Sequence, residues 1–244
     1  GKCYFIERHG MEIPGYFLEK EIVDYKQQLD GDLTFDWPES HDIVKNEVLN
    51  CRENVCIFDQ SSFGKIVLSG IDACKSLDWI CTNNMDVPIG KTVYTAMCNH
   101  KGGVMCDLTV TRLAKDEYYI VTGGSTITHN LEWIKLQTKK FNVLINDVSD
   151  EYGVLSIQGP KSGDLLESIS NVGTDPETNF PFSTHKKIKI NDKEVDAIRL
   201  TFVGELGWEL HIKYQDMKDI YETIIKKGSC FGIKNAGYRA IDSM

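Results

Sequence analysis

The sequence has no long apolar run and no excess of positive charge. No stretch of its 244 residues approaches the roughly 18 to 20 consecutive apolar residues of a transmembrane helix. The formal net charge is −9 and the pI is about 5.2, which argues against a general nucleic-acid-binding surface. The first residues, GKCYFIERHG, lack the apolar segment of a secretory signal and the Arg- and Ser-rich composition of a mitochondrial presequence. We therefore expect a globular chain with no membrane span and no nucleic-acid partner.

The eight cysteines lack the spacing of metal or redox sites. None belongs to a CxxC motif, and no Cys/His cluster has zinc spacing. Most lie in apolar runs such as Val55-Cys56-Ile57, so we expect reduced, buried thiols and no bound metal. The chain also has no GxGxxG after a predicted strand, which excludes a dinucleotide-binding domain within these residues.

Hydrophobic periodicity predicts hairpins separated by amphipathic helices, an α+β pattern. The length suits one large domain or two closely packed ones. Residues 1–40 are rich in aromatic and acidic residues, and we expect them to form an irregular strap across another surface. We expect helices at about 41–52, 73–81, 127–140, 160–169, 215–227 and 239–244, and strands at about 55–59, 63–70, 92–113, 116–124, 141–149, 152–159, 186–200 and 197–212, with turns at 101–103 and 191–192.

The stretch AIRLTFVGELGWELHI, residues 197–212, is the most informative part of the chain. It reads as two apolar strands joined by a tight turn that contains Gly204 and Gly207. Glu209 lies between Trp208 and Leu210, and strand alternation would place it on the solvent side. Alternatively it is buried and meets a group with donors, because burying an unpaired carboxylate costs several kcal/mol. The residues by themselves leave both interpretations open.

Three other residues are candidates for a site. Tyr94 and Asp107 lie on the two strands that flank the 101–103 turn, so the hairpin brings the strands side by side. Asp107 is an acid in an apolar, β-branched run, and alternation makes a solvent-facing position as reasonable as a functional one. Arg239 begins the last predicted helix, where a solvated residue or a weak surface ion pair is the ordinary interpretation. None of the three is specific when taken singly.

Four motifs together carry a family resemblance. GGVMCDLTVTRL, GVLSIQGPKSGDLL, TFVGELGWELHI and GIKNAGYRAIDSM occur in the order found in aminomethyltransferase, the T-protein of glycine cleavage, which residues 41–244 resemble. The chain is still more similar to the C-terminal half of the mitochondrial flavoenzymes sarcosine dehydrogenase and dimethylglycine dehydrogenase, and CNHKGG, FPFSTHK and NAGYRAIDS favour the former. ERHGMEIPGYF resembles the linker that follows their flavin half. The regulatory subunit of pyruvate dehydrogenase phosphatase shares the architecture without an established catalytic site.

The resemblance implies a fold and a function. The fold is an aminomethyltransferase-like folate-binding fold of antiparallel sheets with packed helices over 41–244, incomplete at its C-terminus, with 1–40 as a linker after an absent flavin domain. The function is capture, by tetrahydrofolate, of the one-carbon unit released when a sarcosine dehydrogenase demethylates sarcosine to glycine, giving methylenetetrahydrofolate. FAD would be bound only by the absent half, electron-transfer flavoprotein would be a partner, and the location would be the mitochondrial matrix. Dimethylglycine dehydrogenase, a stand-alone aminomethyltransferase and the phosphatase regulatory subunit are the alternatives, and the fragment alone is expected to be inactive as a dehydrogenase.

The resemblance also implies roles for four residues. Glu209 matches the acid that recognises the pterin, whose edge presents adjacent N–H donors to two carboxylate oxygens. Arg239 matches an arginine that anchors the folate, Tyr94 an aromatic residue that lines the pocket, and Asp107 a catalytic acid near the reactive nitrogens. We therefore expect Glu209 to face folate and Glu205 to be an ordinary turn residue. Two departures, Phe202 in place of a tyrosine and Cys106 in place of the first of two paired acids, argue against T-protein activity on a lipoyl carrier.

Overall fold

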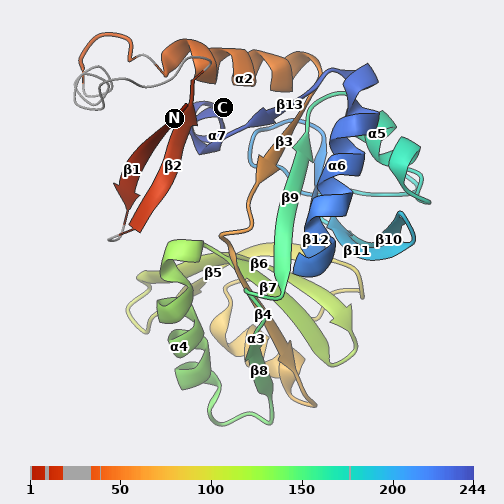
Figure 1. Cartoon of the computed structure of the whole chain (residues 1–244). Coiled ribbons are helices and arrows are strands. Elements are labelled where there is room, and N and C mark those ends of the chain that lie inside the picture. The colour runs from red at the N-terminus through yellow and green to blue at the C-terminus, as the bar shows by residue number, and fades with distance from the viewer. Residues whose placement is uncertain (1, 9–10, 19–33, 39, 176) are drawn as a thin grey trace.

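The computed structural model describes residues 2–8, 11–18, 34–38, 40–175 and 177–244. Its main body is built from two sheets, each covered by helices (Figure 1). The six-stranded sheet has the order β10-β11-β12-β9-β3-β13, and the five-stranded sheet has the order β5-β6-β7-β4-β8. In chain order the strands are β3 (Val55–Asp59), β4 (Gly64–Ser69), β5 (Thr92–Cys98), β6 (Val104–Ala114), β7 (Glu117–Thr122), β8 (Leu144–Asp147), β9 (Tyr152–Gln158), β10 (His185–Ile190), β11 (Lys193–Ile198), β12 (Gly207–Lys213) and β13 (Ile233–Ala236).

Each sheet has a separate apolar core beneath its helices. Leu165 of α5 and Ile220 of α6 pack with Trp208 and Leu210 of the six-stranded sheet. Leu77 of α3 and Ile134 of α4 pack on the five-stranded sheet. The helices are α2 (His41–Glu53), α3 (Ala73–Ile80), α4 (Ile127–Thr138), α5 (Ser162–Ile169), α6 (Met217–Gly228) and α7 (Tyr238–Ser243). No helix in the described part of the chain is long and apolar enough to cross a membrane.

The two sheets meet through the face of the five-stranded sheet opposite α3 and α4 and the face of the six-stranded sheet opposite α5 and α6. Tyr119 and Val121 of β7 cluster there with Ile198 of β11, and all three side chains are buried. Alternation along β12 sends Trp208 and Leu210 toward α5 and α6, so Glu209 and His211 point to the opposite face, between the sheets. Both faces of β12 are therefore covered.

The structure confirms the predicted α+β class and most of the predicted helices and strands. The turn between β10 and β11 has φ of 50° at Asn191 and 61° at Asp192, the left-handed pair that a two-residue hairpin requires. All eight cysteines lie in the described residues and none forms a disulfide. Four are buried as expected (Cys3, Cys51, Cys56 and Cys106), whereas Cys230 is exposed. The helix predicted from Pro160 instead begins at Ser162. The predicted antiparallel pattern has one exception, because β13 pairs with β3 in parallel.

Two predictions about irregular and tight segments are wrong. Residues 3–8 and 11–17 are not irregular: β1 (Cys3–Arg8) and β2 (Met11–Phe17) form an antiparallel pair beside α7 (Figure 1), with the rings of Tyr4 and Tyr16 stacked at 4.9 Å. Residues 19–33 of the predicted strap lie outside the described residues. The connection between β11 and β12 is not a tight turn either, because residues 199–206 form a loop of irregular structure in which Gly204 has φ of 74°.

Candidate functional site

A pocket lies at the junction of the two sheets. Its lining combines β5, β6 and β7 of the five-stranded sheet with β12 and the preceding loop, and its volume is about 160 Å³. The lining includes Phe63, Tyr94, Asp107, Thr122, Phe202 and Glu209. Three of the four residues predicted from the sequence, on three different strands, therefore meet in one cavity.

Glu209 is the buried member of this pocket, with only 1% of its surface exposed. Its Oε2 lies 3.4 Å from Nε2 of His211, whereas Oε1 has no hydrogen-bond partner among the described residues. The solvent-facing interpretation of Glu209 is therefore wrong, because the five-stranded sheet covers the face that alternation assigns to it. A buried carboxylate with an unused oxygen is costly unless a donor meets it, so the site suits a ligand that presents N–H groups.

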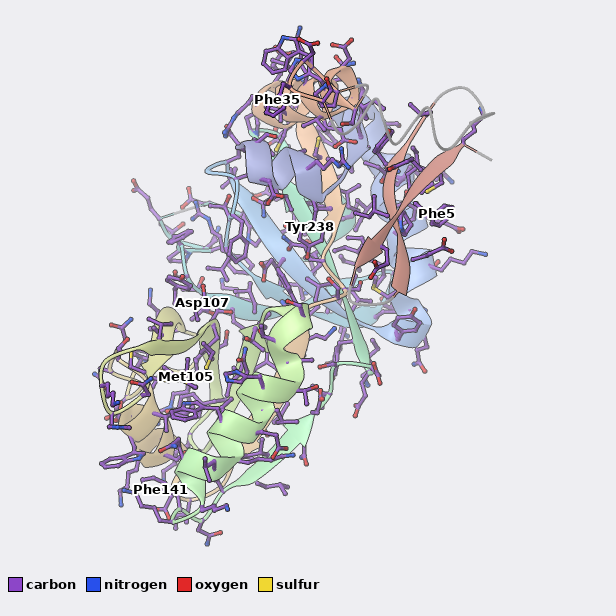
Figure 2. The ribbon with its side chains drawn as sticks, turned by 90° about the vertical axis from the view of Figure 1, so that its left-hand side faces the viewer. Phe5, Phe35, Met105, Asp107, Phe141 and Tyr238 are labelled. Atoms are coloured by element: carbon purple, nitrogen blue, oxygen red, sulfur yellow. The ribbon has the colours of Figure 1, made fainter. Side chains whose placement is uncertain are left out.

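Tyr94 and Asp107 occupy the exposed part of the pocket. The Tyr94 side chain is 61% exposed, and its hydroxyl donates to Oδ2 of Asp107 at 3.0 Å. This hydrogen bond, reinforced by the negative charge of the carboxylate, raises the pKa of the Tyr94 phenol. Figure 2 shows Asp107 at the level where the two sheets meet. The pair therefore places one carboxylate, oriented by a phenol, at the opening above Glu209.

Two phenylalanines give the pocket an aromatic wall. The rings of Phe63 and Phe202 lie 6.2 Å apart in an edge-to-face arrangement at 62°, and Phe202 is 51% exposed. Both belong to loops, one before β4 and one before β12. An aromatic wall suits a flat heterocycle, because ring faces and edges attract each other and exclude water. Phe202 contributes no hydroxyl, in line with the departure noted in the sequence.

Arg239 is not among the residues that line this pocket. Its Nη1 donates to Oγ of Ser40 at 2.7 Å, and its guanidinium lies 4.9 Å from the ring centre of Tyr16. The preceding residue, Tyr238, has its hydroxyl 3.3 Å from that of Ser62, which adjoins Phe63 of the pocket wall. The helix of Arg239 is thus tied to the pocket edge, while the folate-anchoring role of Arg239 stays a prediction.

Sequence reasoning missed His211 and Tyr119. His211 is 1% exposed, and its Nδ1 lies 3.1 Å from the hydroxyl of Tyr119 on β7. Its position two residues after Glu209 was a usable signal, because residues i and i+2 of a strand share a face. Glu205 forms an ion pair with Arg52 at 2.7 Å, an ordinary role for a turn residue. The described residues contain no group of three or more His, Cys, Asp or Glu side chains placed to hold a metal ion.

Comparison with known proteins places this geometry in a family. The family model described as the GCVT N-terminal domain matches residues 2–244. The chain is 40% identical to mitochondrial sarcosine dehydrogenase of Homo sapiens over 99% of its own length and 30% of that protein. It is 33% identical to the mitochondrial pyruvate dehydrogenase phosphatase regulatory subunit of Mus musculus over 98% of its length and 27% of that protein. The chain thus spans less than a third of each of these relatives.

A solved structure shows the same fold. The glycine cleavage system aminomethyltransferase T from Bartonella henselae superposes with a TM-score of 0.73 at 20% sequence identity, covering 90% of this chain and 60% of that one. The predicted aminomethyltransferase-like fold is therefore confirmed. With a family model that matches nearly every residue, the chain belongs to the GCVT N-terminal domain family, as an aminomethyltransferase-like domain related to sarcosine dehydrogenase.

Proposed function

We propose that this chain is the tetrahydrofolate-binding part of a flavin-dependent sarcosine dehydrogenase. In the whole enzyme a flavin oxidises the N-methyl group of sarcosine, and tetrahydrofolate takes up the one-carbon unit as methylenetetrahydrofolate, leaving glycine. The observation that carries this proposal is the buried carboxylate of Glu209, whose Oε1 lacks a partner among the described residues, in a pocket shared with Asp107. Similarity to human sarcosine dehydrogenase over nearly the whole chain supports the choice of reaction.

The residues present fit the pterin end of the cofactor. Glu209 supplies a carboxylate acceptor for adjacent N–H donors, and Phe63 and Phe202 supply an aromatic wall for a flat ring. The pocket, about 160 Å³, is smaller than the roughly 300 to 1,000 Å³ of pockets that bury drug-sized ligands, so it suits the ring system and not the entire cofactor. We assign Arg239 to the carboxylates of the cofactor, because a guanidinium binds a carboxylate through two parallel donors.

Asp107 has the position and chemistry of an acid that assists one-carbon transfer. Its carboxylate lies at the exposed side of the pocket and accepts a hydrogen bond from Tyr94, which orients it. A carboxylate in that place can accept a proton or stabilise a developing positive charge. We therefore assign Asp107 the catalytic role and Tyr94 the role of lining the pocket and orienting Asp107.

The remaining assignments belong to the whole protein. We propose that FAD is bound outside this chain, that electron-transfer flavoprotein accepts the electrons, and that residues 1–40 connect the two parts. The mitochondrial matrix is the proposed location, supported by the word mitochondrial in the names of the human and mouse relatives. The alternative is that the whole protein is a dimethylglycine dehydrogenase, since the chain is 32% identical to the Rattus norvegicus enzyme over 82% of its length.

Calorimetric titration with tetrahydrofolate tests the proposal. We expect the wild-type chain to bind and Glu209→Gln to bind at least tenfold more weakly, because one carboxylate oxygen becomes an amide donor that faces other donors. Glu205→Gln is the matched control: the same substitution four residues away, at an acid paired with Arg52, should leave the Kd within about twofold, since surface pairs contribute little. Equal binding by wild type and Glu209→Gln would refute the pterin role.

A non-enzymatic function is the second candidate. The 33% identity to the mouse phosphatase regulatory subunit over 98% of the chain favours it specifically. That candidate requires no folate, so absence of tetrahydrofolate binding by the wild-type chain, with its fold intact by circular dichroism, would favour the regulatory function over the dehydrogenase.

A further inference from the structure

Glu209 is one end of a buried polar chain that crosses from one sheet to the other. Its Oε2 lies 3.4 Å from Nε2 of His211, and Nδ1 of the same ring lies 3.1 Å from the hydroxyl of Tyr119. Glu209 and His211 are 1% exposed and Tyr119 is 6% exposed. Because His211 and Tyr119 do not line the pocket, they act on it only through Glu209.

The order of donors along this chain follows from the end groups. An ionised carboxylate only accepts hydrogen bonds, so Glu209 requires a proton on Nε2 of His211. In a neutral imidazole Nδ1 is then an acceptor, which the Tyr119 hydroxyl can satisfy by donating. Burial raises the pKa of Tyr119 well above its ordinary value, so the phenol keeps its proton near neutral pH. Among the polar side-chain atoms of Glu209, His211 and Tyr119, Oε1 of Glu209 is then the one without a partner in the described residues.

The charged and titratable groups around the His211 ring do not change this order of hydrogen-bond donors. Asp196 lies opposite His211 on β11, but its Oδ1 already accepts from Nε2 of His185 at 2.7 Å. Val154, opposite His211 on β9, offers no side-chain polar group. Tyr152 packs edge-to-face on Tyr119 with ring centres 6.5 Å apart, so its ring contacts Tyr119. Among the described residues, Tyr119 and Glu209 are thus the hydrogen-bond partners of the His211 ring.

We propose that His211 is a positioning residue for ligand recognition: it donates from Nε2 to Oε2 of Glu209 and leaves Oε1 as the acceptor for an N–H donor of the ligand. Tyr119 fixes the ring by bonding Nδ1. The inference rests on the proposed function for the identity of the ligand, but the donor order is a property of the chain itself. His211 therefore orients the Glu209 carboxylate for ligand binding without contacting the ligand itself.

The donor order can be measured without any ligand. Long-range ¹H–¹⁵N correlation spectra of the ¹⁵N-labelled wild-type chain report which imidazole nitrogen of His211 carries a proton, and loss of the signal in His211→Asn assigns it. A proton on Nε2 at pH 7 is expected. A proton on Nδ1 alone would overturn the proposal, because Nε2 would then accept from a protonated Glu209.

Two amide substitutions separate the two sides of the ring. A glutamine amide reaches roughly the position of Nε2 and can still donate to Glu209, whereas an asparagine amide reaches roughly that of Nδ1 and cannot. For tetrahydrofolate binding by calorimetry we expect His211→Asn to weaken the Kd about tenfold or more and His211→Gln to restore it to within about threefold of wild type, since a hydrogen bond to a charged group contributes on this order. His129→Asn, at an exposed position of α4, is the control, expected to leave the Kd unchanged.

The outcomes distinguish this proposal from the proposed function. Weakening by both amides to the same extent, with melting temperatures matched to each other, would show a packing role for His211 and overturn the inference. If the wild-type chain fails to bind tetrahydrofolate, the proposed function fails, while the imidazole spectrum still decides the donor order. If folate binds and the proton lies on Nδ1 alone, the function survives and the inference about His211 fails.

Discussion

Tyr94 and Asp107 contact each other across the β5–β6 hairpin, with the phenol oxygen 3.0 Å from Oδ2 of the carboxylate. They are not directly paired in the ladder: Tyr94 is opposite Thr109, and Asp107 is opposite Ala96. The contact is therefore diagonal, within the reach of a long aromatic side chain on one face of the sheet. It couples the titration of an exposed phenol to the acid that we assign to one-carbon transfer.

Replacing Asp107 by Asn should lower the pKa of Tyr94. The hydrogen bond to the carboxylate and its negative charge hold the phenol in its neutral form, so their loss lets Tyr94 ionise at lower pH. The difference between wild-type and Asp107→Asn absorbance titrations of tyrosinate should show one phenol moving toward about pH 10. The difference should vanish when both chains also carry Tyr94→Phe, and a difference that persists would contradict the pairing.

Truncating Leu210 should destabilise the chain far more than truncating an exposed leucine. Leu210 is fully buried in the core beneath α5 and α6, and Leu→Ala changes in such sites cost about 2 to 5 kcal/mol. Leu136 on α4 is 53% exposed, so Leu136→Ala should cost within about 0.5 kcal/mol. Urea unfolding followed by circular dichroism measures both, and similar midpoints for the two variants would contradict the assigned face of β12.

A side chain at Gly207 should displace β12 and, with it, Glu209. A Cβ there would stand 2.6 Å from the carbonyl oxygen of Ile157 on the neighbouring strand. That oxygen belongs to the backbone, so it cannot move away without displacing the strand. We expect Gly207→Ala to cost about 1 to 3 kcal/mol, as overpacked sites do, and to weaken tetrahydrofolate binding. Gly237→Ala is the control, since its Cβ would meet nothing closer than 4.0 Å. An unchanged Kd in a destabilised Gly207→Ala would show that Glu209 tolerates the shift.

Removing His185 should make the chain more sensitive to acid. Burial alone would raise the pKa of Asp196, but the hydrogen bond and charge of His185, together with other nearby positive charge such as Lys187, outweigh it and hold that pKa below its usual 3.8. The stability from this pair is therefore present above about pH 3.8 and lost as the pH falls through the lower folded-state pKa. In His185→Asn burial dominates, the pKa of Asp196 rises, and acid unfolding followed by circular dichroism should begin at higher pH. His129→Asn should leave the acid midpoint unchanged.

Local patterns predicted the elements that local physics determines. The 191–192 turn was predictable because Asn and Asp tolerate positive φ, and α2 because its apolar residues follow helical spacing. β13 was missed because Ile233-Lys234-Asn235-Ala236 is short and has two exposed residues at its centre, and only pairing with β3 makes it a strand. The pairing of β1 with β2 was missed because β2 contains Pro14 and Gly15, which usually interrupt a strand, whereas the stacking of Tyr4 on Tyr16 appears only once the strands pair.

The sequence by itself determined the α+β class and the motif order that predicts a folate-binding domain, because these depend on the identity and spacing of residues along the chain. Only the tertiary structure decided whether Glu209 is buried or exposed to solvent. Alternation states only that Glu209 and Trp208 face opposite ways, and it says nothing about whether a second sheet covers either face. The packing of β7 against β12 buries Glu209 beside His211 and leaves Oε1 without a partner in the described chain, which turns a strand acid into a candidate ligand-binding residue.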